Sequence, residues 1–94
     1  MKEFDNGTTI EIIIEIENSF GTKTDPTGDI KITITPVGGE AVVTLQDMTK
    51  RTVGVYFYLW QTSGDETTGV YESSVAITDD AYSIIASDNL FRIV

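Results

Sequence analysis

One phrase, Thr-x-Gly-Val-Tyr, occurs twice in this chain, and it constrains the fold more than any other sequence feature. Residues 52–56 carry the first copy and residues 67–71 the second, and each opens a run of β-branched and aromatic residues. A glycine followed by such a run is typical of a turn that leads into a β-strand. Because the two copies lie close together, we predict neighbouring strands over residues 55–61 and 70–78.

Alternation of apolar and polar residues predicts more strands on both sides of this repeat. Residues 8–17 carry isoleucine at every second position from Ile10 to Ile16, which is the spacing of a half-buried strand. Gly38-Gly39 predicts a hairpin turn, and Asp88-Asn89 a bulge or bend. The other predicted strands cover residues 30–35 and 41–45. Residues 46–52 form a connection, and the last predicted strand is in two pieces, 83–86 and 90–94. No window has helical periodicity, so we predict one domain, residues 1–94, folded as an antiparallel β-sandwich of about seven strands.

Composition removes several classes of partner. The chain has 6 basic and 15 acidic residues and a formal net charge of −9, whereas a nucleic-acid-binding protein needs lysine and arginine to neutralise phosphates. No apolar run approaches the length of a membrane span, so we expect no membrane insertion. Twelve isoleucines, eight valines and fourteen threonines favour strands, because branching at Cβ suits a pleated surface. We therefore expect an acidic, all-β protein.

Segments spread over nearly the whole chain resemble the immunoglobulin-like domains of prokaryotic surface proteins and viral structural proteins. They are Gly7-Thr8-Thr9-Ile10-Glu11-Ile12, Thr24-Asp25-Pro26-Thr27, Gly54-Val55-Tyr56-Phe57-Tyr58, and Gly69-Val70-Tyr71 with Phe91-Arg92-Ile93. The resemblance implies an immunoglobulin-like sandwich that acts as a spacer, adhesive or assembly module. It also implies structural roles for Asp25, Pro26, Gly54, Tyr56, Gly69 and Tyr71.

Tyr71 adds a specific expectation. Residues 67–71 are similar to the Asp-x-Gly-x-Tyr phrase of a tyrosine corner, in which the phenol hydrogen-bonds back to the backbone. The chain departs from that pattern, because Thr67 stands where aspartate is usual and Ser73 stands where antibody domains carry their second cysteine. The resemblance predicts that the Tyr71 hydroxyl hydrogen-bonds back to the backbone and so holds the strand in place.

Few side chains suited to catalysis are present. The chain has no histidine and no cysteine, which excludes histidine-based triads, cysteine nucleophiles and zinc sites built on those ligands. Adjacent carboxylates such as Asp65-Glu66 lie in predicted turns and stay solvated, whereas acid–base catalysis needs a desolvated carboxylate. We predict that the protein is not an enzyme and needs no cofactor.

Calcium is the chemical alternative to that prediction. Hard oxygen ligands suit Ca²⁺, and the loops of a sandwich gather at its two ends, where several carboxylates would meet. Acidic turns also occur for reasons of turn chemistry alone. The candidate ligands are Asp25, Asp29, Asp79 and Asp80.

The predicted strand over residues 55–61 is apolar on both faces, although an outer strand face is normally polar. The resemblance implies that the tyrosines and the tryptophan of this strand pack in the core, as in the family's Gly-x-Tyr-x-Tyr strand, so that the other face is outside. Two explanations need no partner protein: a loop or terminal segment covers the second apolar face, or one end of the strand lies at the rim of a sheet. The third explanation is an exposed apolar patch that binds a partner protein. That candidate patch consists of Ile13, Val55, Phe57 and Leu59.

The expected function is that of a non-catalytic structural or interaction module in a larger assembly. The resemblance favours a cell surface or a virion over the cytoplasm, with other protein domains or subunits as partners. One alternative is a carbohydrate-binding module in which Tyr58 and Trp60 are exposed and stack on sugar rings beside Glu72. Another is a calcium-stabilised adhesion domain. A glycan and a second copy of this chain both stay open as partners.

Overall fold

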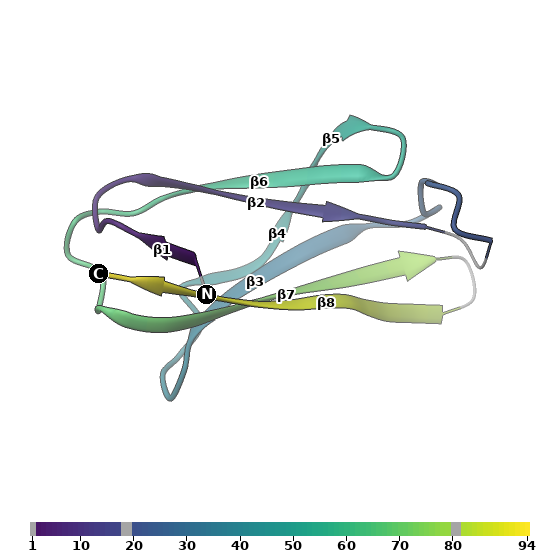
Figure 1. The fold of residues 1–94 in the computed structure, drawn as a ribbon. Helices are drawn as coiled ribbons and strands as arrows, with labels where there is room; N and C mark the ends of the chain where they lie inside the picture. The colour runs from purple at the N-terminus through teal and green to yellow at the C-terminus, as the bar shows by residue number, and fades with distance from the viewer. Residues whose placement is uncertain (1, 18–19, 80–81) are drawn as a thin grey trace.

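The computed structural model folds this chain into two β-sheets that face one another (Figure 1). It describes residues 2–17, 20–79 and 82–94, with the backbone alone for Asp79 and residues 82–89. One sheet has five strands in the order β1-β8-β7-β3-β4, and the other has three in the order β2-β6-β5. The strands are β1 (Lys2–Phe4), β2 (Thr9–Glu15), β3 (Ile30–Pro36), β4 (Val43–Asp47), β5 (Thr49–Thr52), β6 (Val55–Gln61), β7 (Gly69–Asp79) and β8 (Tyr82–Ile93). Nowhere in these residues is there a helix with the length and apolar character needed to cross a bilayer.

The all-β prediction is confirmed, and the differences concern short strands and strand ends. β5 lies in the predicted connection 46–52, and β1 lies in the polar start of the chain. β1 runs parallel to β8, with Lys2 beside Phe91, so the five-stranded sheet is mixed rather than antiparallel. The last strand is continuous, and its bulge is one extra residue of β8 between Ile85 and Asp88.

The two strands that follow the repeated phrase are not neighbours in one sheet, contrary to the prediction. β6 belongs to the three-stranded sheet and β7 to the five-stranded sheet. The turn between them carries the chain across the core, so that the Trp60 and Tyr71 rings lie 5.6 Å apart between centroids. Similar sequence predicted two strands correctly, but the turn decided which sheet each one joined.

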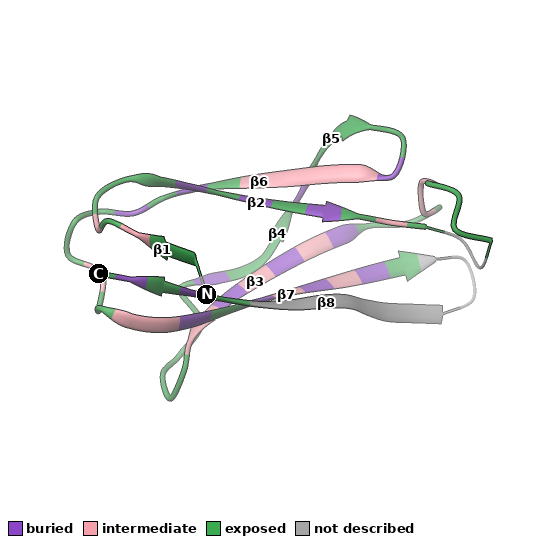
Figure 2. Cartoon of the chain, viewed as in Figure 1, coloured by how far each residue is buried: buried purple, intermediate pink, exposed green. Residues whose placement is uncertain are grey.

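The core lies between the sheets and is built by alternation. Every second residue of β2, β3 and β7 is buried, which Figure 2 shows as alternating purple bands. Ring contacts join the two sheets, because the Trp60 centroid lies 5.6 Å from that of Tyr71 and 6.4 Å from that of Phe91. Tyr71 and Phe91, which are neighbours in the five-stranded sheet, stack on each other at 5.7 Å. The buried apolar residues are Ile10, Ile12, Ile14, Ile30, Ile32, Ile34, Val43, Met48, Trp60, Tyr71, Val75, Ile77, Phe91 and Ile93.

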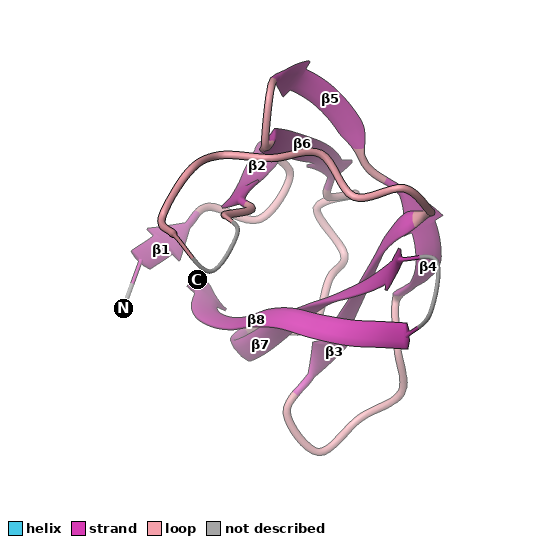
Figure 3. Ribbon diagram, turned by 90° about the vertical axis from the view of Figure 1, so that its right-hand side faces the viewer, coloured by secondary structure: helices cyan, strands magenta, loops and turns pink. Residues whose placement is uncertain are grey.

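The two sides of this fold differ. On one side a single residue, the buried Met48, separates β4 from β5, so the chain passes directly from one sheet to the other. The Met48 amide donates to the Ile30 carbonyl oxygen at 3.1 Å and holds this corner. On the opposite side the short strand β1 stands between β2 and β8, as Figure 3 shows. The first side is therefore closed by continuous chain, and the second is closed only where β1 lies.

Candidate functional site

The outer face of the three-stranded sheet is apolar at its centre. β2 and β6 pair so that Ile13 lies opposite Phe57 and Glu11 opposite Leu59. Ile13 is 42% exposed and Leu59 is 51% exposed, whereas Trp60 on the other face of β6 is only 8% exposed. The predicted orientation of this strand is therefore confirmed. We call Ile13, Val55, Phe57 and Leu59 the outer face.

A charged side chain partly covers this outer face. The guanidinium of Arg51, from β5, lies 4.6 Å from the centroid of the Phe57 ring. Its Nη2 donates to Glu11 Oε2 at 2.8 Å, which fixes the guanidinium over the sheet. Cation–π contacts at exposed sites stabilise by about 0.5–1 kcal/mol. Phe57 is thus half-buried under Arg51, while its neighbours Ile13 and Leu59 stay open to solvent.

The proposed aromatic platform is wrong. Trp60 is buried in the core, and the half-buried Tyr58 packs against that core. Both lie on the inner face of β6, because they pair with Ile10 and Ile12, the buried residues of β2. Glu72 is exposed on the other sheet, beside the buried Tyr71. The three residues share no surface on which a sugar ring could stack.

Asp25 anchors the loop that precedes β3 to the start of β6. Its Oδ1 accepts hydrogen bonds from the Gly54 amide at 2.9 Å and from the Tyr56 hydroxyl at 3.0 Å. Its Oδ2 accepts one from Lys50 Nζ at 2.6 Å. The Gly54 bond and then the Lys50 bond lower the pKa of Asp25 from 3.8 to about 2. Burial, followed by the bond to Asp25, raises the pKa of Tyr56. These contacts give Asp25 and Tyr56 a structural task.

The calcium candidates are not brought together in the described part of the chain. Both carboxylate oxygens of Asp25 already accept hydrogen bonds, from Lys50, Gly54 and Tyr56. Asp29 is exposed, and its backbone carbonyl accepts from the Thr78 amide at 2.9 Å. Asp80 and the side chain of Asp79 lie outside the described residues. Within the described residues, no three carboxylates are placed to hold a metal ion.

The stability of the protein should depend on the charge of Asp25. Its pKa is lower in the folded chain than the ordinary 3.8, so its contribution is complete above about pH 4 and is lost as the pH falls towards 2. Asp25→Asn should lower the free energy of unfolding at pH 7 and flatten its decline between about pH 4 and pH 2. Urea unfolding at a series of pH values measures both effects. Asp65→Asn, in an exposed turn, is the charge-matched control, and an equal response of the two variants contradicts the anchoring role.

The tyrosine corner is present. The Tyr71 hydroxyl donates to the Thr67 carbonyl oxygen at 2.6 Å, and its ring is only 1% exposed. The acceptor is a backbone atom, which explains why threonine serves at a position where aspartate is usual. Gly69 has a φ of +131°, a backbone conformation that residues with a side chain rarely adopt. The second copy of the repeated phrase thus builds the corner that begins β7.

Removing this hydroxyl should cost stability without changing the fold. In Tyr71→Phe the ring stays, but the Thr67 carbonyl loses its donor. Loss of one partner of a buried hydrogen bond typically costs about 1–3 kcal/mol. The same change at Tyr58, for which no hydroxyl hydrogen bond is found among the described residues, should cost less. Chemical unfolding measures both variants, and equal losses would argue against the corner bond.

A groove runs along the open side of the fold, and the sequence did not predict it. It encloses about 500 Å³. Five consecutive residues of β2, 9–13, line one wall, so the groove follows the edge of that strand. The rest of the lining comes from the facing sheet and consists of Lys2, Phe4, Ser73, Leu90 and Phe91. β1 supplies part of its lining by pairing with β8, and the polar start of the chain did not indicate that pairing.

Comparison with known proteins adds no relative: no protein-family model, no curated protein and no solved structure matches this chain.

Proposed function

We propose that this protein is a non-catalytic, immunoglobulin-like module that docks another protein subunit within a cell-surface or virion assembly. The observation that carries the proposal is the outer face. A sheet face that points to solvent is normally polar, yet Ile13 and Leu59 are about half exposed beside Phe57. Contiguous exposed apolar surface marks interaction sites.

Two features support the immunoglobulin-like part of the proposal. The first is a core enclosed between two facing sheets. The second is the tyrosine corner, in which Tyr71 bonds to Thr67 four residues upstream. Both hold strands in place and neither involves a reactive group. The module is therefore suited to presenting a face in a fixed geometry.

Charge indicates what kind of partner the outer face meets. A net charge of −9 on 94 residues makes copies of this chain repel one another. A partner surface with positive charge around an apolar centre would be attracted instead. We therefore propose a basic subunit rather than a second copy as the physiological partner.

Screening of the charge should reveal the apolar outer face. In 1 M salt the Debye length is about 3 Å, so repulsion between copies is largely removed. We expect the chain to be monomeric at low salt and to self-associate weakly in 1 M salt, as measured by size-exclusion chromatography with light scattering. Leu59→Lys should abolish this association. Val37→Lys, at an exposed site in the β3–β4 hairpin, should not. A chain that stays monomeric at both salt concentrations, or that hydrolyses substrates at enzyme-like rates, contradicts the proposal.

A further inference from the structure

We infer that the groove on the open side is a docking site for an extended segment of a basic partner protein, which pairs with the free edge of β2. This inference rests on the proposed function, because it specifies how the partner is held. The docked segment of the partner would be a strand in which lysine or arginine alternates with aliphatic residues. Adding a strand to a sheet edge is an established mode of peptide recognition.

The first argument is the hydrogen-bonding edge of β2. Two bonds mark the ends of its pairing with β6, from the Thr62 amide to the Thr8 carbonyl at 3.1 Å and from the Ile16 amide to the Gly54 carbonyl at 2.7 Å. In an antiparallel pair, alternate residues direct their backbone groups to the partner strand. The even-numbered residues of β2 therefore bond to β6, and Glu11, Ile13 and Glu15 point their amides and carbonyls away from it. No strand pairs with that side of β2 in the part of the chain described.

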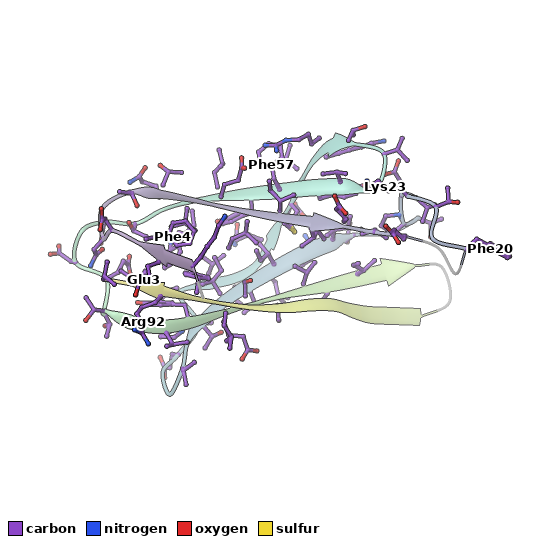
Figure 4. All side chains as sticks on the ribbon, in the orientation of Figure 1. Glu3, Phe4, Phe20, Lys23, Phe57 and Arg92 are labelled. Atoms are coloured by element: carbon purple, nitrogen blue, oxygen red, sulfur yellow. The ribbon has the colours of Figure 1, made fainter. Side chains whose placement is uncertain are left out.

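The second argument is the shape of the open side. β1 already shows how a strand fits there, because its Phe4 ring enters between the sheets and meets Phe91 edge-to-face at 5.8 Å (Figure 4). Among the described residues, β1 covers β8 only at Phe91–Ile93. Beyond it the groove is left with Ile13 on one wall and Leu90 on the other, 42% and 52% exposed. A second strand paired with β2 would direct its aliphatic residues between the sheets, towards Phe4 and Phe91, and the stems of its lysines would cover Ile13 on the other face.

The third argument is charge, which separates a basic strand from a second copy of this chain. On its exposed face β2 reads Glu11, Ile13, Glu15. Two copies of β2 paired antiparallel about Ile13 would place Glu11 opposite Glu15, and like charges directly opposite are destabilising. Lysines at those positions would be favourable. Glu11 and Glu15 each have one internal partner, at 2.8 Å and 3.8 Å, but exposed ion pairs of this kind are weak and leave the carboxylates accessible.

The experiment uses a defined probe, an acetylated and amidated peptide of alternating lysine and isoleucine, about seven residues long to match β2. Titration followed by amide NMR should give saturable binding. The amides of Glu11, Ile13 and Glu15 should shift and become protected from hydrogen exchange. The same peptide with glutamate in place of lysine should bind at least about tenfold more weakly, because it repels the acidic edge. Absence of binding, equal binding of both peptides, or shifts centred on Leu59 would overturn the inference.

One substitution isolates the backbone edge. Ile13→Pro removes an amide that donates to no β2–β6 bond, and proline is tolerated at edge positions of this kind. It should weaken the lysine–isoleucine peptide by about tenfold, whereas Ile13→Ala, which keeps the amide, should weaken it less. Leu90→Lys, which places a positive charge in the groove, tests the same site if the proline variant does not fold. Equal peptide affinity in wild type, Ile13→Pro and Leu90→Lys would overturn the docking site.

The peptide-binding test of the groove and the self-association test of the outer face can fail independently of each other. If the peptide fails to bind while Leu59-dependent association in 1 M salt is intact, strand docking is wrong and the proposed interaction module stands. If the peptide binds at the edge but no salt-dependent association occurs, the outer face is wrong and the groove stands. Self-association that Leu90→Lys abolishes and Leu59→Lys leaves intact would make a second copy the occupant of the groove and overturn the choice of a basic partner.

Discussion

Replacing Trp60 with alanine should remove about 3–5 kcal/mol from the free energy of unfolding. The indole is only 8% exposed and contacts Tyr71 and Phe91 from across the core. Its loss leaves a cavity between the two sheets, at a point where rings from both sheets meet. A domain of this size is typically stable by only about 5–15 kcal/mol, so much of its stability depends on this one side chain. Guanidinium unfolding followed by far-ultraviolet circular dichroism measures the effect without relying on tryptophan fluorescence.

Leu59→Ala is the matched control for this change. Leu59 is the adjacent residue of β6, but it lies on the opposite face and is 51% exposed. Its truncation should cost no more than about 1 kcal/mol, because few of its contacts lie in the core. A Leu59→Ala loss as large as that of Trp60→Ala would mean that β6 presents its other face to the core. Both the outer face and the groove would then have to be reconsidered.

Gly54→Ala should be the second strongly destabilising change, with an expected loss of about 2–4 kcal/mol. Gly54 has a φ of +70°, and a Cβ placed there would lie 2.7 Å from the Ile16 carbonyl oxygen and 2.9 Å from the Thr24 amide nitrogen. Both neighbours are backbone atoms and cannot move aside by rotating a side chain. The substitution would also disturb the amide that donates to Asp25. Denaturant unfolding measures the loss.

The control for Gly54 is Gly38, which separates backbone strain from the close contact. Gly38 has a similar φ of +84°, but a Cβ there meets nothing within 4 Å. Gly38→Ala should therefore show only the conformational cost of a left-handed residue, about 1–2 kcal/mol. If the two variants lose the same stability, the close approach of residues 16, 24 and 54 contributes nothing. In that case the first copy of the repeated phrase needs its glycine for the turn alone.

The two copies of the repeated phrase illustrate what a local pattern contains. Each glycine leads into a strand, as predicted, since Gly54 precedes β6 and Gly69 is the first residue of β7, and both have positive φ. The surroundings differ. A Cβ at Gly54 would meet the Ile16 carbonyl oxygen, the Thr24 amide nitrogen and the Lys23 Cβ, whereas Gly69 has open space where a Cβ would stand. The sequence shows the turn, but the atoms that enclose it come from residues 16–24, some thirty positions away.

Alternation in the sequence was sufficient to determine the all-β fold class, the strands β2, β3 and β7, and the inward face of each. β6 is apolar on both faces, and its inward face was predicted from the family resemblance. The physical reason is that β2, β3 and β7 carry their own signal, because a period of two sorts apolar residues to one side whatever the partner strand is. The Tyr71 corner belongs here too, since its donor and acceptor lie within five residues of the chain.

Apart from the β3–β4 hairpin, which Gly38-Gly39 predicted, tertiary structure decided which strands pair, and with that the candidate site. β1 and β5 are short and largely polar, so their residues carry no apolar pattern, and they are strands only because β8 and β6 offer them edges. Three features of the candidate site follow from contacts between distant segments. They are the burial of Trp60 between the sheets, the hydrogen bonds that make Asp25 an anchor, and the groove beside β2. Which edge of a sheet remains unpaired is a property of the whole arrangement of strands, and no single segment of the sequence specifies it.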